Sequence, residues 1–424
     1  MPAWTVADAR AEPGAQGGSP HSSRGEPASR GEPGPSKRRR RKRRRGRKVF
    51  AKAEAGAAAI RSEPAPAPIL LPVPPSVPPA PEATPRPRGG LPVFAALDLG
   101  TNNCRLLVAV PGRPGQFRVI DAFSRIVRLG EGLSTSGRLA DNAMDRALEA
   151  LKICSDKLAQ RDIRRARLIA TEACRSAANG AEFIGRVKRD TGLDLEVIDR
   201  QTEARLAVSG CGPLVERETQ GLVLFDIGGG SSEIALIDIS RHRTPRLANH
   251  IVAWTSLPVG VVSLAERFGG REVPRGTFEA MIGEVAGHLD AFAGRHRISH
   301  LARGAHFHLL GTSGTVTTLA GVHLGLERYD RRRVDGLWMD RDSVDRMIEK
   351  LLGWNFEQRV ANACIGADRA DLVLAGCAIL EAIRRVWPSE RLRVADRGLR
   401  EGMLSELMAD EGVWRRNWRP EPRA

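Results

Sequence analysis

The sequence predicts an α/β protein with two similar halves and a cleft between them. Beyond residue 90, short apolar runs typical of strands alternate with segments that have helical spacing. An apolar run that ends in an acid and a glycine turn occurs twice, at Asp98-Leu99-Gly100 and at Asp226-Ile227-Gly228. Hydrophobic residues make up 42% of the chain, which is enough for an ordinary core. Strands mixed with helices in two similar halves favour lobes around a ligand-binding cleft.

Residues 1–90 differ in composition from the rest of the 424-residue chain. They carry 18 basic and 7 acidic side chains, whereas the remaining residues carry 48 and 43, so the arm accounts for most of the net charge of +16. Lys37–Lys48 has a base at every position except Gly46, and Pro64–Pro87 contains 11 prolines. Such segments stay extended and cannot bury surface. We expect residues 1–90 to form a disordered arm that either aids solubility or contacts a polyanion.

Composition also excludes several classes of protein. The six cysteines are scattered and include no C-x-x-C, which argues against a zinc site or a disulfide scaffold. No stretch reaches the roughly 20 apolar residues that a membrane-spanning helix needs. The N-terminus lacks the basic-then-apolar pattern of a secretory signal. We therefore expect a cytoplasmic protein that makes no membrane contact.

The elements of both halves can be placed from apolar spacing. In the first half we expect a meander of three strands and then alternating helices and strands, at 91–99, 104–110, 116–127, 140–160 (helix), 167–170, 181–190 (helix) and 195–198. In the second half we expect strands at 221–226, 233–239, 306–310 and 392–394. We expect helices there at 260–268, 278–293, 342–352, 369–386 and 399–408.

The first candidate site follows the first apolar run. Gly100 lets the backbone approach an anion closely, and Thr101 and Asn102 can donate hydrogen bonds to phosphate oxygens. An ordinary Asx-type hairpin turn explains the same residues, so this loop is a weak signal on its own.

The second candidate site contains three consecutive glycines, Gly228–Gly230, followed by Ser231. Three glycines between two strands are costly in backbone entropy, and a tight turn needs only one or two. They suggest backbone N–H groups exposed to an anionic ligand, with a flexible hairpin tip as the alternative. Two such loops facing each other would clamp a phosphate chain from both sides.

Two further side chains are candidates between the loops. Thr202 is a plausible N-cap that places Glu203 in the first turn of a helix, where a glutamate either complements the helix dipole or acts as a base toward water. Arg175 follows a strand end, and its planar guanidinium suits bidentate contact with phosphate. The alternative for Arg175 is a surface salt bridge.

Six motifs occur in a fixed order along the chain: FAALDLGTNNCRLL, ATEACRSAANGAEF, IDRQTEARLA, VLFDIGGGSSEIAL, SLPVGVVSLAERF and LLGTSGTVTTLAGV. Together they resemble the exopolyphosphatase / guanosine pentaphosphate phosphohydrolase family, in the superfamily of actin, hexokinase and the large heat-shock chaperones. The resemblance covers about Phe94–Met408. It implies two ribonuclease-H-like domains around a central cleft, at 91–218 and 219–424, with the last helices able to pack back on the first domain.

The resemblance also implies roles for individual residues. Glu203 resembles the catalytic base that orients water, and Arg175 matches the arginine of the R-x-A-x-N segment. Asp226 and Glu233 match the acids tied to catalysis and, with Asp98, to a bound Mg²⁺. The residues that match phosphate-binding positions are Thr101, Asn102, Cys104, Arg105, Gly228, Gly229, Gly230, Ser231 and Gly314.

Two features depart from the family pattern. Asn103 stands where the family commonly has serine, which replaces a hydroxyl with an amide beside the first loop. Longer members carry a C-terminal helical domain with a His-Asp pair, and no His-Asp dipeptide occurs here. We therefore expect the short two-domain form, with reduced processivity on long chains.

The function that this implies is hydrolysis of terminal phosphoanhydride bonds. We expect a Mg²⁺-dependent exopolyphosphatase that releases orthophosphate, with guanosine pentaphosphate 5′-phosphohydrolase as the alternative, since both substrates end in the same bond. A sugar or acid kinase on the same fold is a further enzymatic alternative. The non-enzymatic alternative is a polyanion-binding or nucleic-acid-binding protein that acts through Lys37–Lys48. A homodimer is implied by the resemblance alone.

Overall fold

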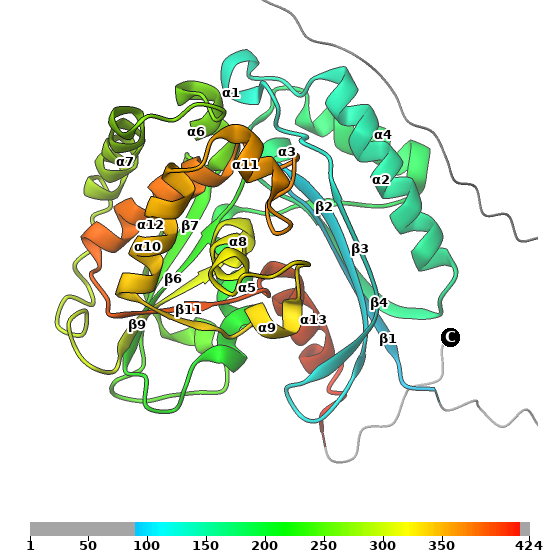
Figure 1. The fold of residues 1–424 in the computed structure, drawn as a ribbon. Coiled ribbons are helices and arrows are strands. Elements are labelled where there is room, and N and C mark those ends of the chain that lie inside the picture. The colour runs from blue at the N-terminus through cyan, green and yellow to red at the C-terminus, as the bar shows by residue number, and fades with distance from the viewer. Residues whose placement is uncertain (1–89, 416–424) are drawn as a thin grey trace, which may run out of the picture. The chain divides into compact units, whose positions relative to one another are not determined.

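Two mixed β-sheets form the framework of residues 90–415, which are the residues that this computed structural model describes (Figure 1). The first sheet has the strand order β3-β2-β1-β4-β5, and the second has the order β10-β11-β9-β6-β7-β8. The strands of the first sheet are β1 (Val93–Leu99), β2 (Asn103–Pro111), β3 (Phe117–Ile126), β4 (Ile163–Ala170) and β5 (Glu196–Val197). The strands of the second sheet are β6 (Gly221–Ile227), β7 (Ser232–Asp238), β8 (Ile251–Leu257), β9 (Phe307–Thr312), β10 (Trp338–Asp340) and β11 (Arg391–Val394). The expected arm lies outside the described residues, apart from Gly90.

Both sheets repeat one arrangement of four strands, as the repeated sequence pattern predicts. In the first sheet β1, β2 and β3 form an antiparallel meander, and β4 runs parallel to β1. In the second sheet β6, β7 and β8 form the meander, and β9 runs parallel to β6. Asp98 lies opposite Arg105 in the first meander, and Asp226 lies opposite Glu233 in the second. The prediction of an α/β protein with two similar halves is confirmed.

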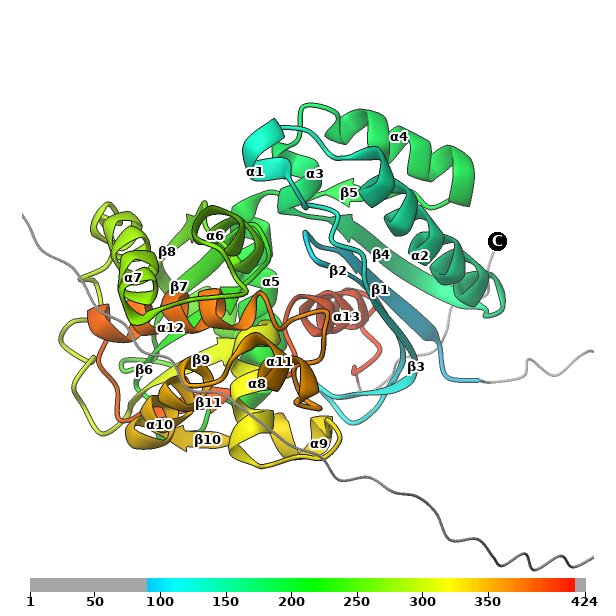
Figure 2. The ribbon, with the colours of Figure 1, turned by 45° about the horizontal axis from the view of Figure 1, so that its top comes forward.

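Helices cover the outer faces of the two sheets (Figures 1 and 2). Against the first sheet pack α2 (Asp141–Ala159), α3 (Glu172–Ser176) and α4 (Gly180–Thr191). Against the second sheet pack α6 (Val261–Phe268), α7 (Arg275–Asp290), α8 (Ser313–His323), α10 (Arg341–Leu352) and α12 (Val373–Val386). Short helices lie in the connections: α1 (Leu133–Ser136), α9 (Arg331–Val334), α11 (Phe356–Ala361) and 3-10 turns at Gly212–Leu214 and Leu247–His250.

Two further helices, α5 (Arg200–Cys211) and α13 (Leu399–Asp410), lie side by side between the sheets (Figures 1 and 2). Apolar residues of α13, including Met403 and Leu404, pack on the inner face of the first sheet. Ala207 and Val208 of α5 pack on the inner face of the second sheet. The last helix of the described residues therefore returns to the first half, and the pair of helices joins the two sheets. The domain boundary at residue 218 stays a prediction.

Glycines allow α5 and α13 to approach closely. A Cβ atom on Gly210 would lie 2.7 Å from the carbonyl carbon of Gly398 and 2.9 Å from the nitrogen of Gly402. A Cβ atom on Gly402 would lie 2.9 Å from the carbonyl carbon of Leu206. All three distances are shorter than a Cβ atom tolerates, so the backbones can touch only because these two residues have no side chain. This contact fixes the position of α5, the helix that carries Glu203.

Two further contacts join the halves, away from the pair formed by α5 and α13. Arg128, which follows β3, donates to both carboxylate oxygens of Asp371 at 3.0 Å. The backbone of Arg128 has a φ of 46°, a conformation that costs a non-glycine residue about 1–3 kcal/mol. Glu266 of α6 accepts hydrogen bonds from the Gly132 N–H at 2.8 Å and the Ser134 hydroxyl at 2.6 Å. This pairing places α1 beside α6 in both ribbon views (Figures 1 and 2).

Most predicted elements are confirmed, with ends that differ by a few residues. Strands β8 and β10 are not among the predicted elements, because β10 has only three residues and both strands lie at the edges of the sheet. The prediction of Thr202 as an N-cap is wrong. Asp199 is the N-cap of α5, and its carboxylate accepts a hydrogen bond from the Thr202 N–H at 2.7 Å. Glu203 nevertheless lies in the first turn, as predicted.

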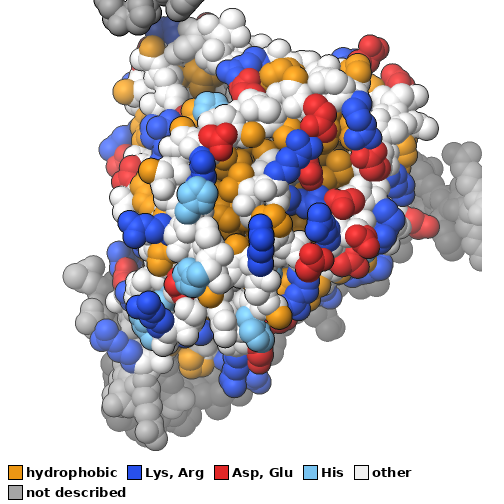
Figure 3. Space-filling view, turned by 90° about the vertical axis from the view of Figure 1, so that its left-hand side faces the viewer, with side chains coloured by type: hydrophobic (Ala, Val, Ile, Leu, Met, Phe, Trp, Pro, Cys, Tyr) orange, Lys and Arg blue, Asp and Glu red, His pale blue; other side chains and the backbone are white. Residues whose placement is uncertain are grey.

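Charges of both signs are mixed over the surface. Figure 3 shows one face of the described residues, on which Lys and Arg side chains alternate with Asp and Glu side chains. Among the described residues, no helix has both the length and the apolarity needed to span a bilayer.

The contact between α5 and α13 gives a test of the fold. We expect Gly210→Ala to lower the free energy of unfolding by about 1–3 kcal/mol or more, because overpacking forces backbones apart. Gly283→Ala is the matched control, since Gly283 lies on the exposed face of helix α7 with nothing within 4 Å of an added Cβ. The control should stabilise by about 0.5–1 kcal/mol, as alanine is the better helix former. Urea denaturation of both variants measures the difference in unfolding free energy, and equal effects would contradict the close contact between α5 and α13.

Candidate active site

The two glycine turns have the same hydrogen-bonded geometry. Between β1 and β2, the Gly100 N–H donates to the carbonyl oxygen of Asn103 at 2.9 Å. Between β6 and β7, the Gly228 N–H donates to the carbonyl oxygen of Ser231 at 3.0 Å. The repeated sequence pattern therefore folds into a repeated turn. Asp98 and Asp226 precede these turns at equivalent positions.

The two turns face each other across the boundary between the halves. A Cβ atom on Gly229 would lie 2.9 Å from Thr101 Cβ and 3.2 Å from the nitrogen of Asn102. A Cβ atom on Gly230 would lie 3.0 Å from Thr101 Oγ1. Gly260 supports the second turn from behind, because its own Cβ would meet the nitrogen of Gly230 at 2.6 Å. Glycine is thus required here for close approach of backbones from two lobes.

Several polar groups of the turns have no partner. Within residues 90–415, the backbone N–H groups of Thr101, Asn102, Gly229 and Gly230 donate to no other residue. The side-chain oxygen of Asn102 is buried and likewise accepts no hydrogen bond from the described residues. Buried polar groups are normally satisfied, and adjacent free N–H groups form anion-binding concavities. The turns are therefore the best candidates for phosphate binding.

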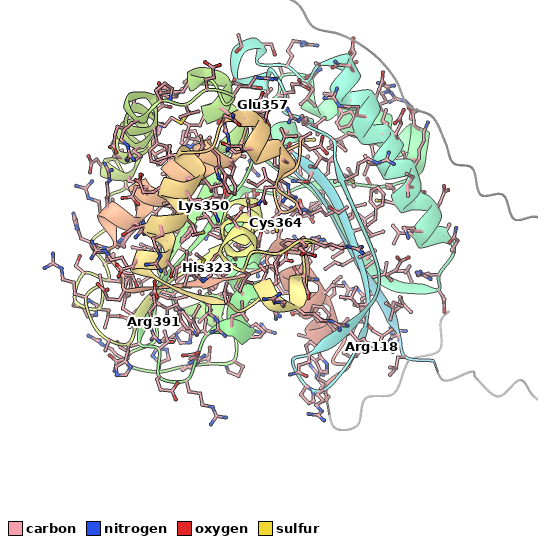
Figure 4. The ribbon with its side chains drawn as sticks, viewed as in Figure 1. Arg118, His323, Lys350, Glu357, Cys364 and Arg391 are labelled. Atoms are coloured by element: carbon pink, nitrogen blue, oxygen red, sulfur yellow. The ribbon has the colours of Figure 1, made fainter. Side chains whose placement is uncertain are left out.

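A cavity of about 630 Å³ lies along the turns between the halves. Both sheets contribute to it, and so do the ends of α5, α8 and α13. Cys364, labelled in Figure 4 beside α8, belongs to the wall formed by the second half. The predicted site residues that line the cavity are Asp98, Thr101, Asn102, Arg105, Glu203, Asp226, Gly228, Gly229, Gly230, Ser231, Glu233 and Gly314.

Four of the carboxylates that line this cavity, Asp98, Glu203, Asp226 and Glu233, have pKa values that burial raises. The pKa of Asp98 rises to about 6 and the pKa of Glu233 rises to about 7. Burial also raises the pKa values of Asp226 and Glu203. Mutual repulsion adds to the shifts, since Asp226 acts on Glu233 and Glu233 acts on Glu203. Such crowding is typical of catalytic and cation-binding sites.

Polar neighbours hold two of these carboxylates in place. The Ser231 and Ser256 hydroxyls donate to Oε1 of Glu233 at 2.7 and 2.8 Å. A hydrogen bond from Ser313 opposes the effect of burial on the pKa of Asp226. Ser313 opens α8 with a φ of 77°, which is unusual for a residue with a side chain and is typical of functional loops.

Glu203 reaches the cavity from the first turn of α5. Its Oε2 accepts a hydrogen bond from Nη2 of Arg175 at 3.0 Å. Arg175 opposes the effects of burial and of Glu233 on the pKa of Glu203. Within the described residues, Oε1 of Glu203 accepts no hydrogen bond and remains available toward the cavity.

Arg175 does not line the cavity, contrary to its prediction as a phosphate clamp. Its guanidinium is held by Glu172 at 2.6 Å, by Glu203 at 3.0 Å and by the carbonyl oxygen of Ile198 at 2.5 Å. The alternative of a surface salt bridge is also wrong, because the side chain is only 18% exposed. The residue lies behind Glu203, on α3.

Cys104 does not line the cavity either, so its prediction as a phosphate-binding residue needs correction. Its side chain is fully buried in the core against α2 and α4. Side chains alternate between the two faces of a strand. Asn103 and Arg105 point into the cavity from β2, and Cys104 between them must point into the core.

The carboxylates fit a divalent cation that retains part of its water shell. Oδ1 of Asp98 is buried and has no hydrogen-bond partner among the described residues, as expected for an atom that awaits a cation or a water. However, in residues 90–415 no group of three or more His, Cys, Asp or Glu side chains is close enough to form a complete metal site. Mg²⁺ commonly binds one or two carboxylates, several waters and substrate phosphates. Asp98, Asp226 and Glu233 could hold such an ion in that way.

Several cavity residues are absent from the sequence prediction. Glu172, Arg400 and Ser313 line the cavity, and Ser256 holds Glu233. Glu172 and Ser313 lie inside recognisable motifs, so their proximity to the site could have been inferred from the sequence. Arg400 and Ser256 carry no such local signal, because α13 and β8 reach the site only through long-range packing.

The family model that matches the chain is described as the Ppx/GppA phosphatase family, and it covers residues 109–411. The chain belongs to this family. The membership confirms the resemblance and the prediction of a hydrolase of phosphoanhydride bonds.

Two curated relatives differ in their length. Exopolyphosphatase 2 of Mycobacterium tuberculosis is 28% identical over 329 residues, which span 74% of this chain and 98% of that protein. Guanosine-5′-triphosphate,3′-diphosphate pyrophosphatase of Aeromonas hydrophila is 28% identical over 320 residues, which span 75% of this chain and 60% of that protein.

Solved structures show the same fold. The family member from Aquifex aeolicus has a TM-score of 0.61 and 26% identity, over 76% of this chain and 99% of that chain. An exopolyphosphatase from Cytophaga hutchinsonii has a TM-score of 0.65 and 25% identity, over 75% of this chain and 98% of that chain. The predicted ribonuclease-H-like class, with two halves around a cleft, is thereby confirmed.

The buried carboxylates give a prediction about stability. Because the pKa of Glu233 rises to about 7 on folding, the folded state binds its proton more tightly, and unfolding free energy falls as pH rises from about 4.5 to 7. In metal-free buffer, we expect Glu233→Gln to raise the unfolding free energy at pH 8 by on the order of 1–3 kcal/mol. Near pH 5 the gain should largely vanish, since the wild-type side chain is then protonated. Thermal unfolding at both pH values measures this, and a variant less stable than wild type at pH 8 would contradict it.

Proposed function

We propose that this chain is a Mg²⁺-dependent exopolyphosphatase that removes the terminal phosphate of inorganic polyphosphate as orthophosphate. The main support is one observation: two glycine turns with free N–H groups face each other beside Glu203 in a single cavity. The relative from Mycobacterium tuberculosis, which is matched over 98% of its length, is named an exopolyphosphatase.

In the proposed reaction, water attacks the terminal phosphorus in line with the bridging oxygen. A new P–O bond forms, the P–O bond to the bridging oxygen breaks, and the shortened chain leaves with the bonding electrons. Glu203 accepts the proton of the water through Oε1, the oxygen that Arg175 does not occupy. Its raised pKa makes it a stronger base than an ordinary glutamate.

The charge of the substrate needs compensation in a cavity lined by acids. The free N–H groups of Gly229, Gly230, Thr101 and Asn102 would bind phosphate oxygens, and Arg105 would stabilise the leaving chain. Membership of the family implies a divalent metal, and we propose Mg²⁺, which would neutralise phosphoryl oxygens when bound by Asp98, Asp226 and Glu233.

A second candidate is release of the 5′ γ-phosphate from guanosine pentaphosphate. The relative from Aeromonas hydrophila, named for a guanosine nucleotide, supports it. We rank it second because the match spans only 60% of that longer protein. Contact of Lys37–Lys48 with a polyanion and formation of a homodimer both stay predictions, and the former concerns residues outside the described range.

The role of Glu203 gives the most direct test. We expect Glu203→Gln to reduce phosphate release about 10²–10⁴-fold, which is the usual contribution of a general base. Binding of tripolyphosphate should stay within a few-fold of wild type, because the glycine turns are unchanged. Phosphate release and calorimetric binding are measured on the same preparations. Near wild-type turnover would remove Glu203 from the catalytic role.

The choice of substrate and metal needs a separate experiment. We expect Mg²⁺-dependent release of phosphate from polyphosphate at a higher kcat/KM than from guanosine pentaphosphate, and loss of both activities with excess EDTA. The two substrates are assayed side by side at equal ionic strength, since contacts with phosphates weaken with salt. A higher kcat/KM for guanosine pentaphosphate would favour the second candidate, and full activity in EDTA would contradict the metal requirement.

A further inference from the structure

A buried carboxylate outside the predicted catalytic set lies at the start of α3. Glu172 is 10% exposed at its side chain and lines the cavity next to the second glycine turn. It accepts hydrogen bonds from Nη2 of Arg175 at 2.6 Å, from Nη2 of Arg200 at 2.9 Å and from the Ser176 hydroxyl at 2.5 Å. Burial raises its pKa, but these hydrogen bonds together hold the pKa of Glu172 below its usual value. Glu172 is therefore an anion at neutral pH.

Most of the hydrogen-bond donors of Arg175 are committed to protein partners. Its Nε and Nη2 both donate to Oε2 of Glu172, Nη2 also donates to Oε2 of Glu203, and Nη1 donates to the carbonyl oxygen of Ile198. A guanidinium has five N–H donors in a rigid plane, and four of them are used here. A bound phosphate would have to displace Glu172 or Glu203 to gain a bidentate contact.

We propose that Glu172 and Arg175 are positioning residues that fix the carboxylate of Glu203 with Oε1 toward the attacking water. This inference rests on the proposed function, in which Glu203 is the base. Glu172 fixes the plane of the Arg175 guanidinium by accepting hydrogen bonds along one side of it. The guanidinium then donates only to Oε2 of Glu203. The Glu172–Arg200 ion pair ties the first residue of α5 to α3, so the helix and its side chain are fixed together.

The charges support this arrangement. Two guanidiniums, Arg175 and Arg200, meet two carboxylates, Glu172 and Glu203, and the group is neutral as a whole. Because Arg175 balances its charge, Glu203 can remain ionised beside Glu233. Both arginines are paired with carboxylates, so no unpaired arginine competes for phosphate. Two other roles are compatible with these contacts. The ion pairs could serve only to tie α3 to α5, or Arg175 could act as a phosphate clamp. The experiment must therefore separate positioning of Glu203 from both of these roles.

The test compares Arg175→Lys, Glu172→Gln and the milder Ser176→Ala in the full chain. A lysine keeps the charge but cannot bridge two carboxylates in one plane. We expect Arg175→Lys and Glu172→Gln to lower kcat about 10–100-fold, as for other residues that orient a reactive group, and Ser176→Ala to lower it less. KM for polyphosphate and the Kd for tripolyphosphate should change less than about three-fold. In a Glu203→Gln background the same changes should cause no further loss of kcat, because the base that they position is already absent.

A matched control comes from the other half of the molecule. Arg384 on α12 is 11% exposed and pairs with both Asp345 at 2.6 Å and Glu381 at 2.8 Å, and it does not line the cavity. Arg384→Lys should therefore lower thermal stability in a comparable way and leave kcat unchanged. This control separates loss of a buried ion-pair network from loss of positioning.

The outcomes are distinct. A raised KM and Kd with retained kcat would overturn the inference in favour of a phosphate clamp. Lowered stability with retained kcat would overturn it in favour of a purely structural network. Additive losses with Glu203→Gln would show that Arg175 acts independently of Glu203 and would also overturn it. If the wild-type protein hydrolyses neither polyphosphate nor guanosine pentaphosphate, the proposed function fails and the inference fails with it. If the wild-type protein is active but the variants give any of the three results above, only the inference is overturned.

Discussion

Gly229 and Gly230 lie against Thr101 with no room for a side chain between them, and this contact holds the two glycine turns close together across the boundary between the halves. Every other feature of the site follows from it. The contact places free N–H groups of both turns on one cavity. It also places Asp98 and Asp226, which precede the turns, at the same cavity from opposite sheets. A larger residue in the second turn would separate the halves and with them the two sets of donors.

The same closeness has an electrostatic cost. Burial raises the pKa values of four carboxylates that enter this cavity from two lobes, and repulsion by a neighbouring carboxylate adds to the shift for Asp98, Glu203 and Glu233. A protein under selection for stability alone would not retain such a group, because the burial of several ionised carboxylates opposes folding. Sites that trade stability for function commonly show this pattern. The unpartnered Oδ1 of Asp98 indicates where a cation would relieve part of the cost.

The features that could be predicted from the sequence are those that depend on residues close together in the chain. Three glycines after a buried acid indicate a turn that binds anions, and the similar acid–glycine pattern at Asp98 indicates a second turn. The structure contains both turns, and they share one hydrogen-bond pattern. The residue type of Arg175 suits a phosphate clamp, but its neighbours in the fold, Glu172 and Glu203, occupy the guanidinium instead. Cys104 matches a phosphate-binding position through the family resemblance alone, and alternation along strand β2 turns its side chain into the core. Edge strand β8, which carries Ser256, depends on pairing with β7 and has no strong local pattern of its own.

The position of Glu203 connects the fold to the chemistry. Its helix, α5, packs on the second sheet through Ala207 and Val208, whereas Glu172 and Arg175 belong to α3, which packs in the core of the first sheet. The ion pair between Arg175 and Glu203 therefore crosses between the cores of the two halves. Any rotation of one half relative to the other would change this 3.0 Å contact before it altered the interior of either half, since packed cores resist deformation. The orientation of Glu203 is thus coupled to the contact between the glycine turns, so the proposed base and the proposed phosphate-binding groups are brought together by the same arrangement of the two halves.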